Sequence, residues 1–273
     1  MNRDRAQTGR RRFEGCAVLV TGAAGGLGRA DCLALASEGA HLWAADIDVA
    51  AAEALVAELA AVGGSGQAVH LDVADADSWS ALADEVEAAG PLHGLVNNAG
   101  VSLRAGIADT TVEQWQRVME INLSSVFYGL KTLTPALARG AEDGGAAVVN
   151  VSSIAGMVGY FSATYGTSKW GVRGLSKVGA LELAAHGIRV NSLHPGLTST
   201  PLLHQAPDTT FVDESLRSVP AGRLATPQEI ARVVAFLLSE DSTYVTGEEV
   251  VVDGGLTSGG LYHRILAGLA DKP

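Results

Sequence analysis

The sequence TGAAGGLG, residues 21–28, decides the fold of this chain of 273 residues. An apolar run at 16–20 precedes it, and an Ala- and Leu-rich segment follows it as far as Glu38. A second apolar run at 41–45 then ends in Asp46. A strand, a glycine-rich turn, a helix and a second strand that ends in an acid form the pattern of a dinucleotide-binding βαβ unit. In such a unit the glycines let the backbone approach a pyrophosphate, and the helix N-terminus receives its charge.

The same alternation of apolar runs and helical segments continues toward the C-terminus without a linker. Seven strands that alternate with six helices predict an α/β fold: a single-domain Rossmann fold with a doubly wound parallel sheet and helices on both faces. Right-handed crossovers bring the carboxyl ends of the strands to one edge, where ligands bind in such sheets. The remaining strands are predicted at 67–71, 92–96, 146–151, 188–193 and 249–252, and the later helices at 50–62, 78–89, 112–138, 163–185 and 227–238.

Three segments fall outside this regular pattern. Residues 1–12 contain five Arg and one Asp, which predicts a disordered Arg-rich leader before a domain at 13–255. Residues 198–224 are rich in Ser, Thr and Pro without a clear period, and we expect them to fold over the site as a lid. Residues 256–273 form a C-terminal tail, and the sequence does not decide whether it joins a subunit interface.

Composition and charge exclude several classes of protein. The formal net charge is −11, and the leader carries about +4 of positive charge, so the body is strongly acidic and nucleic acid is not expected as a partner. No apolar run reaches the length of a membrane span. The run after Arg10-Arg11-Arg12-Phe13 is too short for an export signal, which favours a cytoplasmic protein. Cys16 and Cys32 form no CxxC motif, and the seven His are scattered, so we expect reduced thiols and no metal site.

A candidate for proton transfer lies in the helix predicted at 163–185. Tyr165 and Lys169 are four residues apart, so they share one helix face. A phenol holds its proton to about pH 10, and a nearby ammonium lowers that pKa by favouring the phenolate. An isolated pair of this kind would be read as an ordinary surface Tyr beside an unrelated Lys. Here the pair occurs in a chain whose predicted strand ends carry further polar residues. That combination favours a catalytic role for the pair over a purely structural one.

With these residues in view, the chain resembles the classical short-chain dehydrogenase/reductase family over residues 13–255. The loop Gly22-x-x-x-Gly26-x-Gly28 is similar to the cofactor loop of that family. Further matching motifs are Asn97-Asn98-Ala99-Gly100 after the fourth strand, Pro195-Gly196 with Thr198 beside the nicotinamide, and a catalytic tetrad of Asn122, Ser153, Tyr165 and Lys169.

The resemblance implies a role for each member of the tetrad. Tyr165 exchanges a proton with the substrate oxygen, and Lys169 lowers the pKa of that tyrosine and holds the nicotinamide ribose. Ser153 hydrogen-bonds the same substrate oxygen, and Asn122 fixes a water in a proton relay. Ser153 lies twelve positions before Tyr165, whereas in many relatives the serine lies thirteen positions before the tyrosine, which would point to Ser152. We choose Ser153, because a shift of the strand by one residue would turn every side chain to the other face.

The resemblance also implies a nicotinamide cofactor. Asp46 would accept a hydrogen bond from a free 2′-hydroxyl and repel a 2′-phosphate, so NAD is favoured over NADP. Asp72 would receive the adenine amino group, although it could instead cap a turn or helix. The expected cofactor contacts are Gly22, Gly25, Gly26, Leu27, Gly28, Asp46, Ile47, Asp72, Val73, Asn98, Ala99, Gly100, Tyr165, Lys169, Pro195, Gly196, Leu197 and Thr198.

The expected substrate is a hydrophobic secondary alcohol or its ketone. Ser153, Tyr160, Phe161, Tyr165, Leu202 and Leu203 would contact it. Within the family the chain looks most similar to hydroxysteroid and cyclic-alcohol dehydrogenases. The alternatives are a 3-oxoacyl-thioester reductase, which Asp46 disfavours because such enzymes use NADPH, and a catalytically silent NAD-binding regulator. Relatives pair such helices into tetramers, and a homotetramer is expected through small residues of the Tyr165 helix, namely Gly166, Gly171, Gly174 and Gly179.

Overall fold

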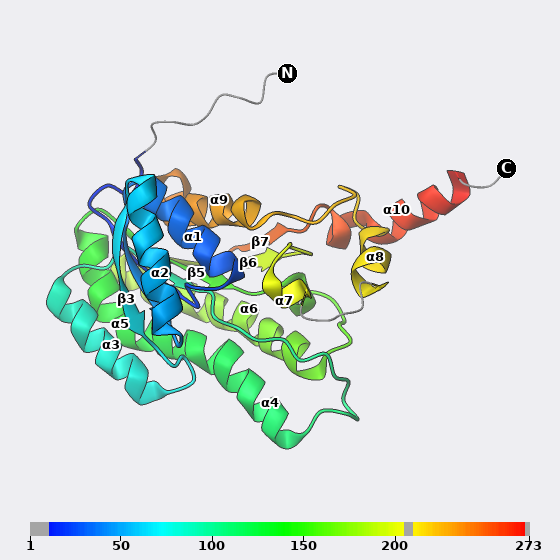
Figure 1. Ribbon diagram of the computed structural model, residues 1–273, viewed down its shortest axis with the longest axis horizontal. Helices are drawn as coiled ribbons and strands as arrows, with labels where there is room; N and C mark the ends of the chain where they lie inside the picture. The colour runs from blue at the N-terminus through cyan, green and yellow to red at the C-terminus, as the bar shows by residue number, and fades with distance from the viewer. Residues whose placement is uncertain (1–10, 205–209, 271–273) are drawn as a thin grey trace, which may run out of the picture.

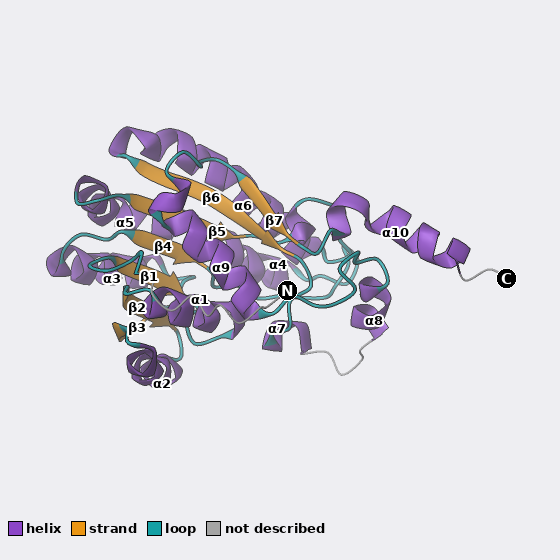
Figure 2. Ribbon diagram, turned by 90° about the horizontal axis from the view of Figure 1, so that it is seen from above, coloured by secondary structure: helices purple, strands orange, loops and turns teal. Residues whose placement is uncertain are grey.

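One parallel sheet of seven strands forms the centre of the protein. The computed structural model describes residues 11–204 and 210–270. The strand order is β3-β2-β1-β4-β5-β6-β7, as Figure 2 shows from above. The predicted doubly wound Rossmann fold is therefore confirmed. The strands are β1 Ala17–Thr21, β2 His41–Asp46, β3 Ser65–His70, β4 Gly94–Asn97, β5 Ala146–Val151, β6 Ile188–Pro195 and β7 Glu249–Val252.

The order in which the chain adds strands to the sheet reverses at β1. From β1 the chain builds outward through β2 to β3, and then returns to place β4 on the other side of β1. In this register Leu19 of β1 lies between Trp43 of β2 and Leu95 of β4. Ligands bind outside the carboxyl ends of the strands at such a reversal. The topology therefore places the site beyond the ends of β1 and β4.

Helices cover the two faces of the sheet, and each face has its own hydrophobic core (Figure 1). Along β1, Val18 and Val20 pack into one core and Leu19 into the other. Burial on both faces explains why the strands are continuous apolar runs. One layer contains α1 Gly26–Ser37, α2 Val49–Leu59 and α9 Pro227–Leu238, and the other contains α3 Ala76–Ala89, α5 Ser125–Glu142 and α6 Ala163–Leu183.

The helix predicted at 112–138 is interrupted. It consists of α4 Val112–Met119, a π-helical turn η2 at Glu120–Ser124, and α5. A π-turn adds one residue to a helical turn, which hydrophobic spacing in a sequence does not reveal, and such turns are frequent at functional sites. The short 3-10 helices are η1 Ala60–Val62, η3 Ile154–Gly156, η4 Ala184–His186 and η5 Glu240–Ser242.

The predicted lid and tail contain helices that the sequence pattern did not predict. The lid holds α7 Pro201–His204 and α8 Thr210–Leu216, and residues 205–209 lie outside the described part. The tail forms α10 Leu256–Ala270, which extends away from the sheet in both views (Figures 1 and 2). Within the described residues, none of the helices has the length and apolar character needed to cross a membrane.

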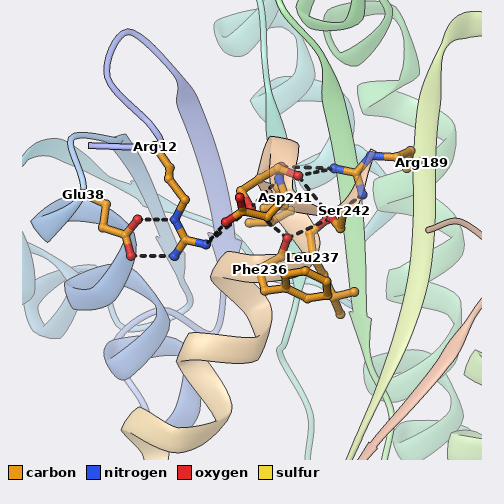
Figure 3. A network of polar contacts seen from close by, with 9 residues as sticks. Arg12, Glu38, Arg189, Phe236, Leu237, Asp241 and Ser242 are labelled. Atoms are coloured by element: carbon orange, nitrogen blue, oxygen red, sulfur yellow. Dashed lines mark hydrogen bonds and ion pairs between the residues drawn. The ribbon is translucent and has the colours of Figure 1, made fainter. Parts of the chain in front are cut away.

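The folded domain begins earlier than predicted. Arg12 donates from Nη2 to Glu38 Oε1 at 2.6 Å and from Nη1 to Asp241 Oδ2 at 3.0 Å (Figure 3). These ion pairs tie the chain before β1 to the end of α1 and to η5. The expectation of a disordered leader through residue 12 is therefore wrong for Arg12, while residues 1–10 lie outside the described residues.

Candidate active site

A cavity of about 1060 Å³ opens beyond the carboxyl ends of the strands. Its lining includes residues at or just after the ends of β2, β4, β5 and β6, as the topology requires. Cavities that hold small ligands typically measure about 300–1,000 Å³. The volume is therefore sufficient for a large ligand, or for a cofactor together with a substrate.

One half of the cavity is built around the N-terminus of α1. Gly25 is the N-cap residue and makes no side-chain capping bond, and the first turn contains no acidic residue. The free N–H groups and the helix dipole at this end favour an anion. Gly22 has φ +62°, a conformation that glycine adopts without strain. This half of the site therefore fits a pyrophosphate.

Asp46 lines the same half and is held in place by the backbone. Its Oδ2 accepts from Ala24 N at 3.0 Å and its Oδ1 from Asp48 N at 3.1 Å. Carboxylate oxygens have additional lone pairs that can accept from a ribose hydroxyl. Arg29, the cation nearest to the loop in sequence, forms an ion pair with Glu58.

Four of the predicted cofactor residues do not line the cavity. A Cβ atom on Gly28 would lie 2.2 Å from Gly22 O, so this glycine allows close packing below the loop. Asp72 Oδ1 accepts from Ala74 N at 3.0 Å, so Asp72 caps a turn, which was the alternative to binding the adenine amino group. Val73 O accepts from Trp79 Nε1, and Ile47 is exposed to solvent. The predicted residues that do line it are Gly22, Gly25, Gly26, Leu27, Asp46, Asn98, Ala99, Gly100, Tyr165, Lys169, Pro195, Gly196, Leu197 and Thr198.

Tyr165 is placed by the first turn of α6. Ser162 caps this helix by accepting from Tyr165 N at 3.2 Å. Tyr165 and Ser153 both line the cavity. Burial raises the pKa of Tyr165 above its usual value, and the interaction with the Ser153 side chain opposes that rise. Without a cofactor the net shift is therefore upward, because loss of solvation has the larger effect, and the lowering of this pKa by Lys169 stays a prediction.

The structure separates Ser153 from Ser152. Ser153 Oγ accepts from Ala155 N at 3.1 Å at the start of η3, on the side of Tyr165. Ser152 is almost completely buried, and its Oγ donates to Lys169 O at 2.9 Å. Successive side chains of an extended chain point in opposite directions. Both serines line the cavity, but the Ser152 hydroxyl is engaged by the backbone of α6, and the choice of Ser153 as the catalytic serine stays a prediction.

Lys169 and Asn122 are both buried, and both lie close to Gly100. Lys169 Nζ donates to Val151 O at 2.8 Å and lies 5.8 Å from the centroid of the Tyr165 ring. Burial lowers the pKa of Lys169 to about 8. A Cβ atom on Gly100 would lie 3.3 Å from Asn122 Oδ1 and 3.5 Å from Lys169 Nζ. Both polar groups thus lie close to the position that a side chain of residue 100 would occupy.

The π-turn fixes Asn122 to the loop after β4. Asn122 Oδ1 accepts from Val101 N at 2.8 Å, and its Nδ2 donates to Val101 O at 2.9 Å and to Ser168 Oγ at 3.1 Å. Asn122 does not line the cavity and has no exposed surface. It connects the loop to α6 one residue before Lys169.

The other half of the cavity is apolar and aromatic. The Tyr160 ring lies 5.9 Å from the Tyr165 ring and 4.3 Å from the Phe161 ring, between centroids. Phe161 in turn lies 5.5 Å from Phe211 of α8. The predicted substrate residues Tyr160, Phe161, Leu202 and Leu203 all belong to the lining, as do Ser153 and Tyr165.

Several lining residues were not predicted from the sequence. Arg104 and Phe211 lie in segments without a motif. Leu256, Leu261 and Tyr262 come from α10, whose helical spacing of Leu261, Ile265 and Leu269 could have indicated an amphipathic helix. Among residues 11–204 and 210–270, no group of three His, Cys, Asp or Glu side chains could hold a metal ion.

Comparisons with known proteins agree with this site. A family model described as enoyl-(acyl carrier protein) reductase matches residues 22–257. A cyclohexanol dehydrogenase from Acinetobacter is 40% identical over 90% of this chain and 97% of that protein. A 3-alpha-(or 20-beta)-hydroxysteroid dehydrogenase from Mycobacterium tuberculosis is 41% identical over 93% of each chain. A cyclopentanol dehydrogenase from Comamonas testosteroni is 41% identical over 88% of this chain and 96% of that protein.

Solved structures give the same assignment. A short-chain type dehydrogenase/reductase from Mycobacterium marinum superimposes with a TM-score of 0.85 and 31% identity, over 91% of this chain and 98% of that one. A chain from Beutenbergia cavernae, solved with bound NADP, has a TM-score of 0.85 and 32% identity, over 92% and 100% of the two chains. Fold, site and sequence agree, and the protein is a member of the short-chain dehydrogenase/reductase family.

Proposed function

We propose that the protein is an NAD-dependent oxidoreductase that interconverts a hydrophobic, cyclic or steroid-like secondary alcohol and its ketone. The observation that carries this proposal is that Tyr165 and Ser153 line the same cavity, which has one apolar half and one anion-binding half. The names of relatives about 40% identical, which act on cyclohexanol, cyclopentanol and hydroxysteroids, support the same substrate class.

The chemistry divides between the cofactor and the chain. A bound nicotinamide supplies the hydride acceptor or donor at its C4 atom. Tyr165 takes the proton from the alcohol oxygen as phenolate, or returns it to the ketone oxygen as phenol. Ser153 donates a hydrogen bond to the same oxygen and stabilises the charge that develops there.

Lys169 and Asn122 act behind Tyr165. With a pKa of about 8, Lys169 is mostly protonated at neutral pH, and its charge favours the phenolate needed for alcohol oxidation. A relay water held by these two polar groups would lie beside Gly100, close to Asn122 Oδ1 and Lys169 Nζ. Asn122 would hold that water, and protons would reach solvent along this path.

Asp46 supports the preference for NAD. Its anchored carboxylate can accept from a 2′-hydroxyl and would repel a 2′-phosphate, while Arg29 is engaged with Glu58. A structural neighbour was solved with NADP, so both cofactors have to be compared directly. A 3-oxoacyl-thioester reductase, the alternative from the sequence, would be expected to require NADPH.

The test is a set of initial rates with NAD and with NADP over cyclic, steroid and linear secondary alcohols. We expect turnover of cyclic alcohols with NAD, its loss in Tyr165→Phe, and unchanged NADH binding by that variant. Tyr160→Phe is the matched control, because it removes a hydroxyl from the neighbouring ring that takes no part in proton transfer. A preference for NADP would overturn the Asp46 argument and favour the thioester reductase. NAD binding without turnover of any of these alcohols would favour the silent regulator.

A further inference from the structure

Arg104 introduces a positive charge into the apolar half of the cavity. The charged residues that line the cavity, within the described part of the chain, are Asp46, Arg104 and Lys169. Asp46 belongs to the cofactor half, and Lys169 lies behind Tyr165. Arg104 is therefore the charged side chain that a substrate would meet away from the reacting carbon.

The backbone around Arg104 is attached to the catalytic helix on both sides. Leu103 O accepts from the hydroxyl of Ser162, the N-cap of α6. Ala105 O accepts from Ala163 N, at the first residue of α6, at 3.0 Å. The position of Arg104 relative to Tyr165 is thus fixed by two hydrogen bonds to the helix that carries Tyr165.

The Arg104 side chain contacts the predicted lid, and most of its donors have no partner among the described residues. Its Nη2 donates to Leu203 O at 3.3 Å, and its guanidinium carbon lies 4.9 Å from the centroid of the Phe211 ring. No carboxylate of the described residues forms an ion pair with it. A guanidinium has five N–H donors in a fork that matches a carboxylate. The side chain is exposed, so an incoming anion can reach it.

An aromatic wall connects Arg104 to Tyr165. Tyr160 lies beside Tyr165, Phe161 beside Tyr160, and Phe211 between Phe161 and Arg104. A ring packed on this wall, with its carbinol at Tyr165, would extend its far end toward Arg104. The wall supplies apolar contact along the ring, and Arg104 supplies one charged group at its end.

We infer that Arg104 binds a carboxylate on the substrate, at the end of the ring opposite the carbinol, so that the preferred substrate is an anionic cyclic alcohol. This inference rests on the proposed function and makes its substrate class more specific. The carboxylate accepts hydrogen bonds from the guanidinium, which orients the ring along the aromatic wall and positions the carbinol at Tyr165.

The test compares 4-hydroxycyclohexylacetate with its neutral amide, 4-hydroxycyclohexylacetamide, which has nearly the same shape. We expect the wild-type protein to prefer the acid in kcat/KM with NAD. Arg104→Gln should lower kcat/KM for the acid by about 10- to 100-fold, mainly through KM, because charge-assisted hydrogen bonds are lost. The amide should change by less than about threefold, since it makes no charged contact. Arg104→Lys should retain part of the preference.

Three outcomes would overturn the inference. One is an equal loss of kcat/KM for the acid and for the amide in Arg104→Gln, which would mean that Arg104 only supports the lid. Another is a raised KM for NAD in Arg104→Gln while the ratio of kcat/KM for the acid to kcat/KM for the amide is unchanged. That result would mean that Arg104 binds the cofactor. The third is turnover of neutral cyclic alcohols with no preference for the acid, which would leave the proposed function intact. Arg232→Gln, an exposed residue of α9 outside the cavity lining, controls for net charge.

A binding measurement keeps the test valid if no alcohol is oxidised. Calorimetry with NADH present would compare cyclohexylacetate with cyclohexylacetamide on the wild type and Arg104→Gln. Tighter binding of the acid that disappears in the variant would support the Arg104 site even though the proposed reaction had failed. Equal binding of the two compounds, or an unchanged preference in the variant, would reject it.

Discussion

Asp31 places a carboxylate in the interior of the protein, within α1. It has no exposed surface, and neither of its side-chain oxygens has a hydrogen-bond partner among the described residues. Burial raises the pKa of Asp31 well above its usual value. The folded protein therefore holds this proton more tightly than the unfolded chain does. The contribution of Asp31 to stability is complete below the unfolded pKa of about 4 and is lost as pH rises toward the folded pKa.

We predict that Asp31→Ala stabilises the protein at neutral and alkaline pH. The free energy of unfolding should rise by about 1–3 kcal/mol at pH 8, because a buried polar group without a partner is removed. Its decline between about pH 5 and pH 8 should also become smaller. Urea unfolding across this range would measure both effects, with the exposed Asp84→Ala as control. A less stable variant at pH 8 would show that Asp31 has a favourable role.

At the scale of single residues, sequence patterns identified the candidate residues that belong to a motif. They did not identify residues whose role depends on their three-dimensional surroundings. Gly22, Ser153 and Tyr165 could be located because their spacing is tied to strand and helix ends. Arg104 could not, since its role depends on contacts with Leu203 and Phe211, about a hundred residues away in the chain. The missing partner of Asp31 is likewise visible only after the helix is packed.

Whole elements were easier to predict than their irregularities. The strands at 146–151 and 249–252 and the helix at 227–238 agree with the structure, because apolar runs and the Thr226 capping box mark their ends. The π-turn at Glu120–Ser124 was not predicted. One inserted residue leaves the apolar spacing within α4 and within α5 unchanged, so the sequence pattern does not reveal it. Helix α10 was not predicted because it follows β7, the last strand of the described chain, and so lies outside the alternation of strands and helices.

The C-terminus of α9 depends on an arginine from the neighbouring strand. Arg189 of β6 donates to Leu237 O at 2.8 Å, Leu238 O at 3.3 Å and Ser239 O at 3.0 Å, beside Ser242 (Figure 3). The last carbonyls of a helix have no partner within the helix, and a cation stabilises the negative end of its dipole. Arg189 therefore attaches α9 to the sheet.

We predict that Arg189→Gln destabilises the protein by about 2–3 kcal/mol, because several charge-assisted hydrogen bonds to buried carbonyls are lost. Urea unfolding would measure the change in the free energy of unfolding. Arg232→Gln, on the exposed side of the same helix, should change it by less than about 0.5 kcal/mol. Equal effects of the two substitutions would mean that the contacts of Arg189 contribute nothing specific.

At the scale of the whole molecule, the structure changes which residues of α6 could form the interface of the expected homotetramer. A Cβ atom on Gly171 would meet Leu123 at 2.6 Å, and one on Gly179 would meet Leu130 at 3.5 Å, so both glycines pack inside the protein. Gly166 faces Tyr160 of the cavity wall. Three of the four small residues proposed for the interface therefore serve the protomer itself. Gly174 alone of these four is open, with no described atom within 4 Å of a Cβ placed there.

The outer face of α6 nevertheless has the character of an interface. Trp170, Gly174, Val178 and Leu181 follow at helical spacing, and Leu181 is 81% exposed. Phe127 is exposed on α5, which covers the same face of the sheet. A row of large apolar side chains around one glycine can pack against its own copy across a two-fold axis, because the glycine lets the two helices approach closely.

We therefore predict that the wild-type protein is a tetramer of 28.0 kDa protomers and that Leu181→Glu reduces it to a smaller species. The substitution would place a charge from each protomer in the contact, where like charges repel and lose solvation. Light scattering after gel filtration would measure the mass. Val62→Glu is the control, since Val62 is also exposed but lies at the end of η1 and away from α6. A monomeric wild type, or a tetramer that tolerates Leu181→Glu as well as Val62→Glu, would rule out the α6 face as the interface.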